Sequence, residues 1–227
     1  MTIRHKLYSL GVIAILGIMT LLGTSSHFAN QSQELGHAIK LVGDLEIRLL
    51  NLRRNEKDFL LRSNIKYLDK FDGNVDKFLV IEQELAGILN RYDLPSSHQF
   101  KQDLLAYQKG FQTLVSAYGR YGLDAESGLW ASFERELSAA EQNADHQQIM
   151  ALTKFSELVK AGEMDKSLLQ GLYVPALIES ARQLAAQKQT IGVAYNKGLL
   201  GDTRALSHAV EQQFKTFSSA ERCGTSS

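Results

Sequence analysis

A dense block of basic residues in the first third of the chain could bind an anion. The block consists of Arg53, Arg54, Lys57 and Arg62. A carboxylate that is held between helices needs fixed, forked donors, which guanidinium groups supply better than ammonium groups. The block is therefore the candidate binding site for a small organic acid. A structural interpretation competes with this one, in which the basic groups form ion pairs with Glu56, Asp58 and neighbouring helices and so hold a bundle in register.

No other combination of residues indicates catalysis or metal binding. The histidines are scattered, without an HExxH motif, and no serine lies in a GxSxG or P-loop motif. The single cysteine, Cys223, excludes a disulfide framework and a cysteine metal cluster. Lys plus Arg and Asp plus Glu number 25 each, without the basic surplus of a typical nucleic-acid-binding protein. We expect no enzyme, no metal or cofactor, and no nucleic-acid partner.

The basic block lies on a long predicted helix, residues 8–62. Apolar residues recur along this helix at spacings of three and four, namely Leu41, Leu45, Leu49 and Leu52, and the next position in the series is Glu56. A carboxylate at such a position costs free energy unless a cation meets it. The candidate cations are Arg53, Arg135 and Arg204. Alternatively, the helix rotates slightly and Glu56 lies on a solvated flank.

The same helix begins in an uncharged apolar run. The run covers residues 7–23, at the short end of the roughly 17–25 residues that span a bilayer, and the small polar residues after it extend the predicted span to residue 26. Arg4 and Lys6 precede it, so the positive-inside rule places residues 1–6 in the cytoplasm. We predict a single-pass protein of a bacterial inner membrane, with residues 27–217 in the periplasm. The alternative is a cleaved signal peptide, for which the cleavage site is poor.

The rest of the chain predicts amphipathic helices that pack back onto the first one. Only two prolines and a hydrophobic share of 44% favour an all-α protein. The expected helices are residues 65–91, 97–121, one long helix from the turn at 122–128 to 161, residues 164–194, and a last helix ending at 217. Pro175 either kinks its helix or starts a new segment. Residues 218–227 lack an apolar period and predict a disordered tail.

Pairs of glycines repeat along the chain. A shift of 70 residues aligns Gly122 with Gly192 and Gly128 with Gly198. Each pair precedes a long amphipathic stretch, and glycine suits turns because it adopts left-handed conformations without a Cβ clash. We expect two related turns at the corners of a bundle; two corners of independent origin are the alternative.

Three segments together resemble the sensor region of bacterial methyl-accepting chemotaxis proteins, and more narrowly the helical bimodular sensor domain. They are LNLRRNEKDFLLR with the following IKYLDKF (residues 50–71), GLDAESGLW (122–130) and IGVAYNKGLLGDTR (191–204). The resemblance covers about residues 41–217. It implies an all-α fold in which a transmembrane helix runs into an elongated antiparallel bundle of two stacked four-helix modules. It also implies a homodimer, and a small-molecule ligand such as an organic acid, or a periplasmic binding protein, as partner.

The family's second transmembrane helix, HAMP linker and signalling coiled coil have no counterpart here, because no apolar run follows Phe217. The resemblance therefore predicts a sensory region without its own signalling domain: a truncated or frame-shifted receptor, or a chain that was ended early. Two other functions stay open. One is the input region of another membrane signalling protein, such as a sensor kinase or a cyclic-dinucleotide enzyme. The other is a membrane-anchored helical adaptor without a ligand.

Overall fold

The fold of the chain, taken from a computed structural model, is all-α, as predicted. The structure describes residues 3–92, 94, 98–124, 126–170 and 172–224, and within them it contains seven α-helices and no strand. The α-helices are α1 (Ile3–Arg62), α2 (Lys66–Arg91), α3 (His98–Tyr121), α4 (Gly128–Glu141), α5 (His146–Ala161), α6 (Pro175–Val193) and α7 (Leu200–Gly224). A 3-10 helix, η1 (Lys166–Leu169), precedes α6, and a π-helical segment, η2 (Ala194–Leu199), joins α6 to α7.

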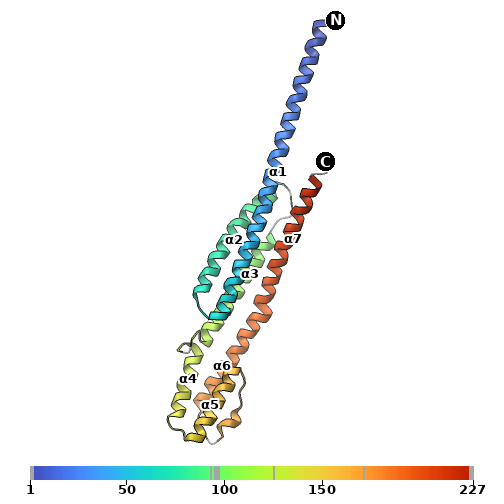
Figure 1. Cartoon of the computed structure of the whole chain (residues 1–227). Coiled ribbons are helices and arrows are strands. Elements are labelled where there is room, and N and C mark those ends of the chain that lie inside the picture. Colours follow the sequence, from blue (N-terminus) through green and yellow to red (C-terminus); the bar gives the residue numbers. More distant parts are fainter. Residues whose placement is uncertain (1–2, 93, 95–97, 125, 171, 225–227) are drawn as a thin grey trace.

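The molecule is elongated, and its long helices run along one common direction (Figure 1). The N-terminal part of α1 projects beyond all other helices at one end, while α4, α5 and α6 lie at the opposite end. Two separate hydrophobic cores follow this axis. We call the core nearer the projecting part of α1 the proximal core and the other the distal core.

The proximal core is formed by α1, α2, α3 and α7 with the end of η2. Each of these helices carries apolar residues at spacings of three and four and therefore turns one stripe inward. Aromatic rings fill the centre: Phe59 of α1 meets Phe111 of α3 edge-on at 5.6 Å between ring centroids, and Phe71 of α2 meets Tyr107 of α3 at 5.1 Å. Helices that are far apart in sequence thus share one apolar interior.

The distal core is formed by α4, α5, η1 and α6. Phe133 of α4 and Phe155 of α5 are fully buried in it, together with Leu184 of α6. Trp130 lies between this core and the end of α3, where its ring stacks on Tyr121 with 6.2 Å between centroids. The end of α3 therefore contributes to the distal part of the molecule as well.

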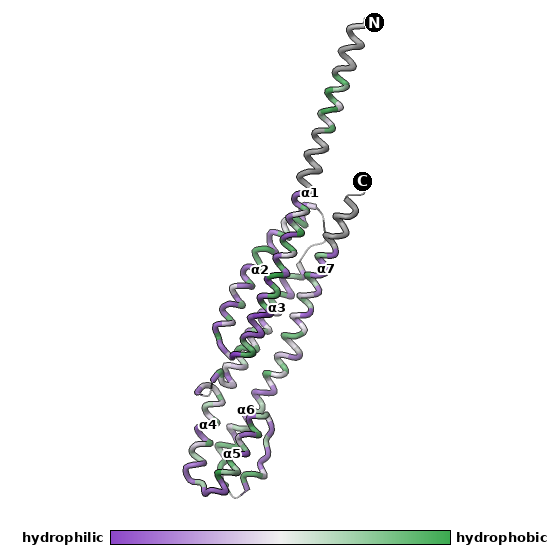
Figure 2. Tube along the Cα trace, viewed as in Figure 1, coloured by the Kyte–Doolittle hydropathy of each residue, from purple (hydrophilic) through white to green (hydrophobic). Residues whose placement is uncertain are grey.

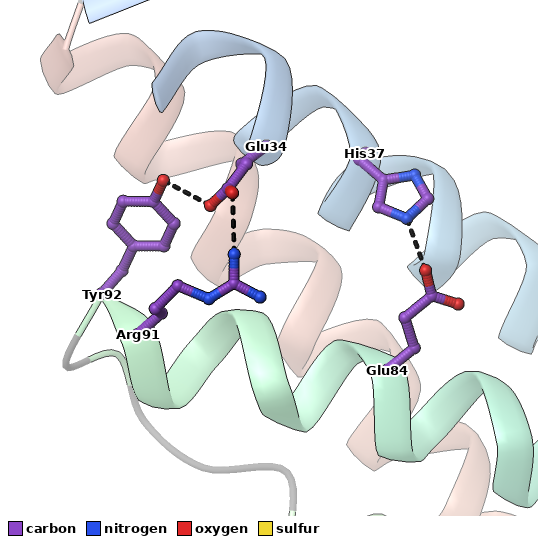
Figure 3. Close-up of polar contacts among 5 residues, drawn as sticks. All are labelled: Glu34, His37, Glu84, Arg91 and Tyr92. Atoms are coloured by element: carbon purple, nitrogen blue, oxygen red, sulfur yellow. Dashed lines mark hydrogen bonds and ion pairs between the residues drawn. The ribbon is translucent and has the colours of Figure 1, made fainter. Parts of the chain in front are cut away.

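Hydrogen bonds and ion pairs link α1 to α2 near the point where α1 extends beyond the bundle (Figure 3). Glu34 accepts hydrogen bonds from Arg91 Nη1 at 2.7 Å and from the Tyr92 hydroxyl at 2.6 Å. One turn further along α1, His37 Nε2 lies 2.8 Å from Glu84 Oε1. These pairs are largely exposed, so each contributes at most about 1 kcal/mol, and they act mainly to orient the two helices.

The long helix expected to end at residue 161 is in fact two helices. α4 ends at Glu141 and α5 begins at His146, after a turn that the sequence reading missed. Asp145 starts the second helix as its N-cap, because its side chain accepts from the Gln148 backbone N–H at 2.9 Å while Gln148 Oε1 accepts from the Asp145 N–H at 2.9 Å. This capping box satisfies backbone donors that a continuous helix would have bonded internally.

Two further boundaries correct or refine the sequence predictions. Pro175 occupies the first turn of α6, so it starts a new segment, where its missing N–H costs nothing. α7 continues to Gly224, so the prediction of a disordered tail is wrong for residues 218–224. Residues 225–227 of that tail lie outside the described residues, as do residues 1–2, 125 and 171 and all but residue 94 of the expected turn at 93–97.

The two glycine pairs adopt different conformations. Gly122 (φ +125°) and Gly128 (φ +61°) form a true turn, in which an added Cβ would lie 2.5 Å and 2.7 Å from backbone oxygens. Gly192 and Gly198, by contrast, lie in helical and π-helical backbone with no left-handed φ. The prediction of a second corner at residues 195–198 is therefore wrong, because the chain continues from α6 into α7 without turning.

The π segment has a physical cause in the spacing of the inward-facing residues. Ile191, Tyr195, Leu199 and Thr203 face the proximal core or lie buried in it. Three successive spacings of four exceed three spacings of 3.6 by about one residue. A π turn, with its wider i→i+5 bonding, accommodates the extra residue and keeps both α6 and α7 in register with their cores.

The projecting part of α1 carries exposed apolar side chains. The large apolar residues from Val12 to Leu21 are 56–71% exposed, and Figure 2 shows them as a hydrophobic stretch outside the bundle. Over the described part of the chain, no helix contains an apolar stretch long enough to cross a membrane. The predicted span at 7–26 is longer than this stretch, and the side chains of residues 7–11 and 22–26 lie outside the described part.

Candidate functional site

A polar layer crosses the proximal core at Glu56. The Glu56 side chain is only 7% exposed, so the alternative of a solvated flank is wrong. The fully buried Tyr107 of α3 donates its hydroxyl proton to Glu56 Oε2 at 2.6 Å. Thr203 of α7 is buried beside them, and its own hydroxyl donates to the carbonyl of Leu199 at 2.8 Å. Three helices thus contribute polar groups to one level of an otherwise apolar interior.

Burial controls the protonation of this layer. Desolvation raises the pKa of Glu56, and the hydrogen bond from Tyr107 and the positive charges of Arg53 and Lys57 offset only part of that rise. Burial also raises the pKa of Tyr107, and the neighbouring Glu56 raises it further. The phenol therefore keeps its proton and remains a donor. The carboxyl group is the titratable member of the layer.

The predicted ion pair of Glu56 and Asp58 with the basic block is not formed in the described part of the chain. Glu56 is satisfied by a phenol rather than by a guanidinium, and the candidate cations Arg53, Arg135 and Arg204 have exposed side chains. Asp58 is half-buried, and no ion pair to it is present among the described residues. A guanidinium at the surface keeps its hydration, which it would lose by entering the core.

A groove of about 410 Å³ lies between α1 and α7, next to the polar layer. It is lined by Val42, Glu46, Leu49, Leu50, Arg53, Ser207, Val210, Glu211 and Phe214. Glu56 follows Arg53 by one helical turn, and the Ser207 hydroxyl donates to the Thr203 carbonyl at 2.9 Å, so on both helices the groove lies about one turn from the layer. Its walls are mainly apolar, and its charged members are the guanidinium of Arg53 and the carboxylates of Glu46 and Glu211. A guanidinium among apolar walls can hold a small carboxylate that has an apolar part.

The structure does not gather the predicted basic block into one site. Arg53 lines the groove between α1 and α7. Arg62 lies at the end of α1, with its guanidinium carbon 6.0 Å from the centroid of the Tyr67 ring. Arg54 and Lys57 are exposed on the surface of α1. The block is thus a stretch of one helix surface whose members face different neighbours, and of its four residues only Arg53 lines the groove.

The sequence reading missed the partners of Glu56. The hydroxyl role of Tyr107 has one sequence signal: a tyrosine on the apolar face of a helix needs a hydrogen-bond acceptor, which a buried carboxylate supplies. Asn55 and Gln213 were also missed; each is buried with an amide nitrogen that has no acceptor in the described part of the chain. Among the described residues there is no cluster of three or more His, Cys, Asp or Glu suited to a metal ion.

No family model, curated protein or solved structure matches the chain. The resemblance to the helical bimodular sensor domain therefore stays a prediction from the sequence. The features of this chain that bear on function are the long α1 helix, the buried polar layer and the nearby groove.

Proposed function

We propose that the chain is the membrane-anchored sensory region of a bacterial chemotaxis transducer, and that it senses a small extracytoplasmic molecule. The supporting observation is the course of α1. This single helix of 60 residues connects an exposed apolar stretch with the proximal core, where it carries Arg53 and Glu56. A helix with one end in a bilayer and the other beside a ligand can transmit a small shift from one to the other.

In this proposal residues 7–26 form a transmembrane helix in a bacterial inner membrane, and residues 27–217 form the periplasmic bundle. The exposed, uncharged stretch from Val12 to Leu21 supports the anchor. Within it, the Thr20 hydroxyl donates to the carbonyls of Leu16 at 3.1 Å and Gly17 at 2.9 Å. A bilayer requires such internal satisfaction, because lipid offers no partner to a polar side chain.

The periplasmic part would consist of two stacked four-helix modules. The proximal module contains α1, α2, α3 and α7 around one core. The distal module contains α4, α5 and α6, with the end of α3 as its fourth member through the Tyr121–Trp130 contact. A homodimer belongs to the proposal as well. Two exposed large apolar residues of α1 outside the groove support it, namely Ile47 and Leu61.

The proposed ligand is a small organic acid in the groove between α1 and α7, with its carboxylate on Arg53. Glu46 and Glu211 also line this groove, and Lys215 compensates Glu211 through an ion pair at 2.7 Å. The ligand would favour one packing of α7 against α1 over another. It can shift that equilibrium only by the difference between its affinities for the two packings.

Calorimetric titration of the full chain in nanodiscs with acetate, succinate and benzoate tests the proposal. We expect at least one acid to bind, and Arg53→Gln to weaken its binding by about tenfold or more, because a charge-assisted hydrogen bond contributes about 1.5–3 kcal/mol. Arg54→Gln is the matched control, since Arg54 is the neighbouring exposed guanidinium outside the groove. Equal binding by both variants, or no binding of any acid, would contradict the proposal.

A further inference from the structure

The π-helical segment η2 joins two helices that belong to different cores (Figure 1). α6 buries Leu184 in the distal core, whereas α7 buries Leu206 in the proximal core. Within η2 the helical bonding widens, since one acceptor of the Leu200 backbone N–H is the carbonyl of Tyr195, five residues back. The segment therefore holds one residue more than α-helical bonding would place there.

Neither core uses this extra residue. Twelve residues separate Ile191 from Thr203, whereas three α-helical turns take about 11. Asn196, in the middle of η2, is exposed. Without it, the four inward-facing residues from Ile191 to Thr203 would be spaced four, three and four apart, which is the ordinary pattern of an apolar stripe. A continuous α-helix could therefore bury the same side chains, so packing alone does not require the π segment.

Glycines surround the π segment without a need for them in the observed conformation. A Cβ added at Gly192 or Gly198 would meet no atom within 4 Å, and neither residue has a left-handed φ. Glycine at such a position destabilises a helix relative to alanine. On α3 the residue that approaches η2 is also a glycine, Gly110, where an added Cβ would lie 3.5 Å from Leu199 Cδ1. At these three glycines no side chain has to move aside when the backbone of the segment rearranges.

We propose that η2 is a movable joint. Its extra residue passes from η2 into the first turn of α7 and back, while α6 stays fixed in the distal core. The step rotates Leu199 by about 100° and moves it by about 1.5 Å along the helix axis. In this second register Gly198 takes the inward place of Leu199, so the core loses a leucine and the second register is the less populated one. The joint is a property of the helices and does not depend on the organic-acid proposal.

The second register reaches the polar layer of the proximal core. The Thr203 hydroxyl donates to the Leu199 carbonyl at 2.8 Å, and this carbonyl changes direction when the extra residue enters α7. The contacts of α6 are not affected, for example the bond from Gln187 Nε2 to the Ala117 carbonyl of α3 at 2.9 Å. The joint thus lets α7 change its hydrogen bonding beside Glu56 while the distal core keeps its packing.

Deletion of a single residue tests whether the extra residue is dispensable. We expect deletion of Asn196 to keep or raise the urea midpoint of the full chain in detergent, because the continuous helix buries the same side chains. The matched control is deletion of Lys109, which is exposed on α3 between the buried Tyr107 and Phe111. α3 also contacts both cores but is α-helical throughout, so this deletion should lower the midpoint or abolish cooperative unfolding. A midpoint below that of the wild type after deletion of Asn196 would overturn the inference.

Hydrogen–deuterium exchange of the full chain in nanodiscs tests the movement itself. We expect the backbone amides of residues 194–203 to exchange at least tenfold faster in the wild type than in the variant that lacks Asn196, because this variant has no extra residue to move. Equal exchange of this segment in the two proteins would show that the π segment is fixed, and the joint would be refuted.

Gly198→Leu distinguishes a movable segment from a fixed one by the sign of its effect. In a movable joint, leucine fills the inward place in either register, so exchange over residues 194–203 should become at least fivefold faster. In a fixed segment the same change should slow exchange, because leucine is the better helix former. Gly73→Leu is the control, since Gly73 is a helical glycine of α2 whose Cβ would also meet no atom within 4 Å. Exchange in Gly198→Leu that is no faster than in the wild type, or an equal rise in Gly73→Leu, contradicts the joint.

Discussion

The proximal and distal cores are built from similar amphipathic helices but bury different side chains. In the described part of the chain, the proximal helices bury Asn55, Glu56, Glu82, Thr203 and Gln213, whereas the distal helices bury one polar side chain, Ser156. Buried polar groups cost free energy that apolar groups of the same volume would not cost. The distal core therefore has the composition of a scaffold. The proximal core is less stable than an all-apolar core of the same volume would be, and the groove between α1 and α7 lies about one turn from its polar layer.

The largest expected effects separate the two cores as folding units. Phe111→Ala in the proximal core and Phe155→Ala in the distal core should each cost about 3–5 kcal/mol, because both rings are fully buried. The single tryptophan, Trp130, packs against the distal core, so its fluorescence reports distal unfolding while far-UV circular dichroism reports all helices. Phe155→Ala should shift the fluorescence transition and Phe111→Ala mainly the dichroism transition.

If both variants shift both signals equally, the two cores unfold as one cooperative unit and the division into two modules is wrong. Urea titration of the full chain in detergent gives both signals from one sample, and the wild type provides the reference for each.

Removal of the Tyr107 hydroxyl tests whether the polar layer distinguishes the proximal core from the distal core. Tyr107→Phe should cost about 1–3 kcal/mol, because Glu56 is left buried without its donor. The loss should be greater at pH 8 than at pH 5, since the ionised carboxylate depends on the donor more than the protonated carboxyl does. Tyr118→Phe is the control: Tyr118 contacts the proximal core and is half-buried, with no hydroxyl hydrogen bond in the described part. Equal losses for both variants at both pH values would argue against the layer.

The glycine pairs distinguish the turn at 122–128 from the π segment. Gly128→Ala should lower the free energy of unfolding by about 1–3 kcal/mol, because a left-handed φ and a Cβ 2.7 Å from the Arg120 carbonyl oxygen strain the turn. Gly192→Ala should raise it by about 0.5–1 kcal/mol, because the position is helical and open. Chemical denaturation of the two variants checks the opposite signs. If both variants lower the free energy of unfolding, the second glycine pair also needs a turn conformation, and the helical assignment at Gly192 is contradicted.

The smallest expected loss of stability tests the capping box at the start of α5. Asp145→Ala should cost about 1 kcal/mol, because the Gln148 backbone N–H loses its acceptor. The shift should appear in the fluorescence of Trp130, since the box lies in the distal part of the molecule. Asp145→Asn, which can still accept this bond, should retain most of the stability. A loss of the same size in both variants would show that the cap is not the cause.

The helical class, the end of α1 and the bounds of α2 and α3 to within a residue could be predicted from the sequence, because the apolar stripes are long and end at clear breaks. α1 begins at Ile3, five residues before the predicted start. The split at Asp145 was missed because the apolar period continues across it, although the capping box Asp145–Gln148 is itself a sequence signal. Gly192 and Gly198 predict a turn where the structure has the π segment η2. The better signal is the spacing of four residues between successive inward-facing side chains from Ile191 to Thr203. A turn would have moved Thr203 out of register with Tyr107.

The candidate site was predictable only in part. Glu56 stood out because a carboxylate interrupted an apolar series, and the structure confirms that it lies in the core. Its hydrogen-bond partner Tyr107 could not be predicted, because apolar periodicity shows which face of a helix is buried but not which other helix it packs against. The role of the basic block as a ligand site stays a prediction, and the structure narrows it to Arg53 as the residue beside both the groove and Glu56.

The pH dependence of unfolding tests the central claim, that the proximal core buries a titratable group, most directly. Burial raises the pKa of Glu56 in the native state above its unfolded value of about 4.3, so stability from the protonated carboxyl is fully present below that pH. It is lost as the pH rises through the native pKa. Glu56→Gln cannot titrate, so the wild type should lose stability relative to this variant as the pH is raised from 4 to 8. Parallel pH profiles for the two proteins would contradict the claim.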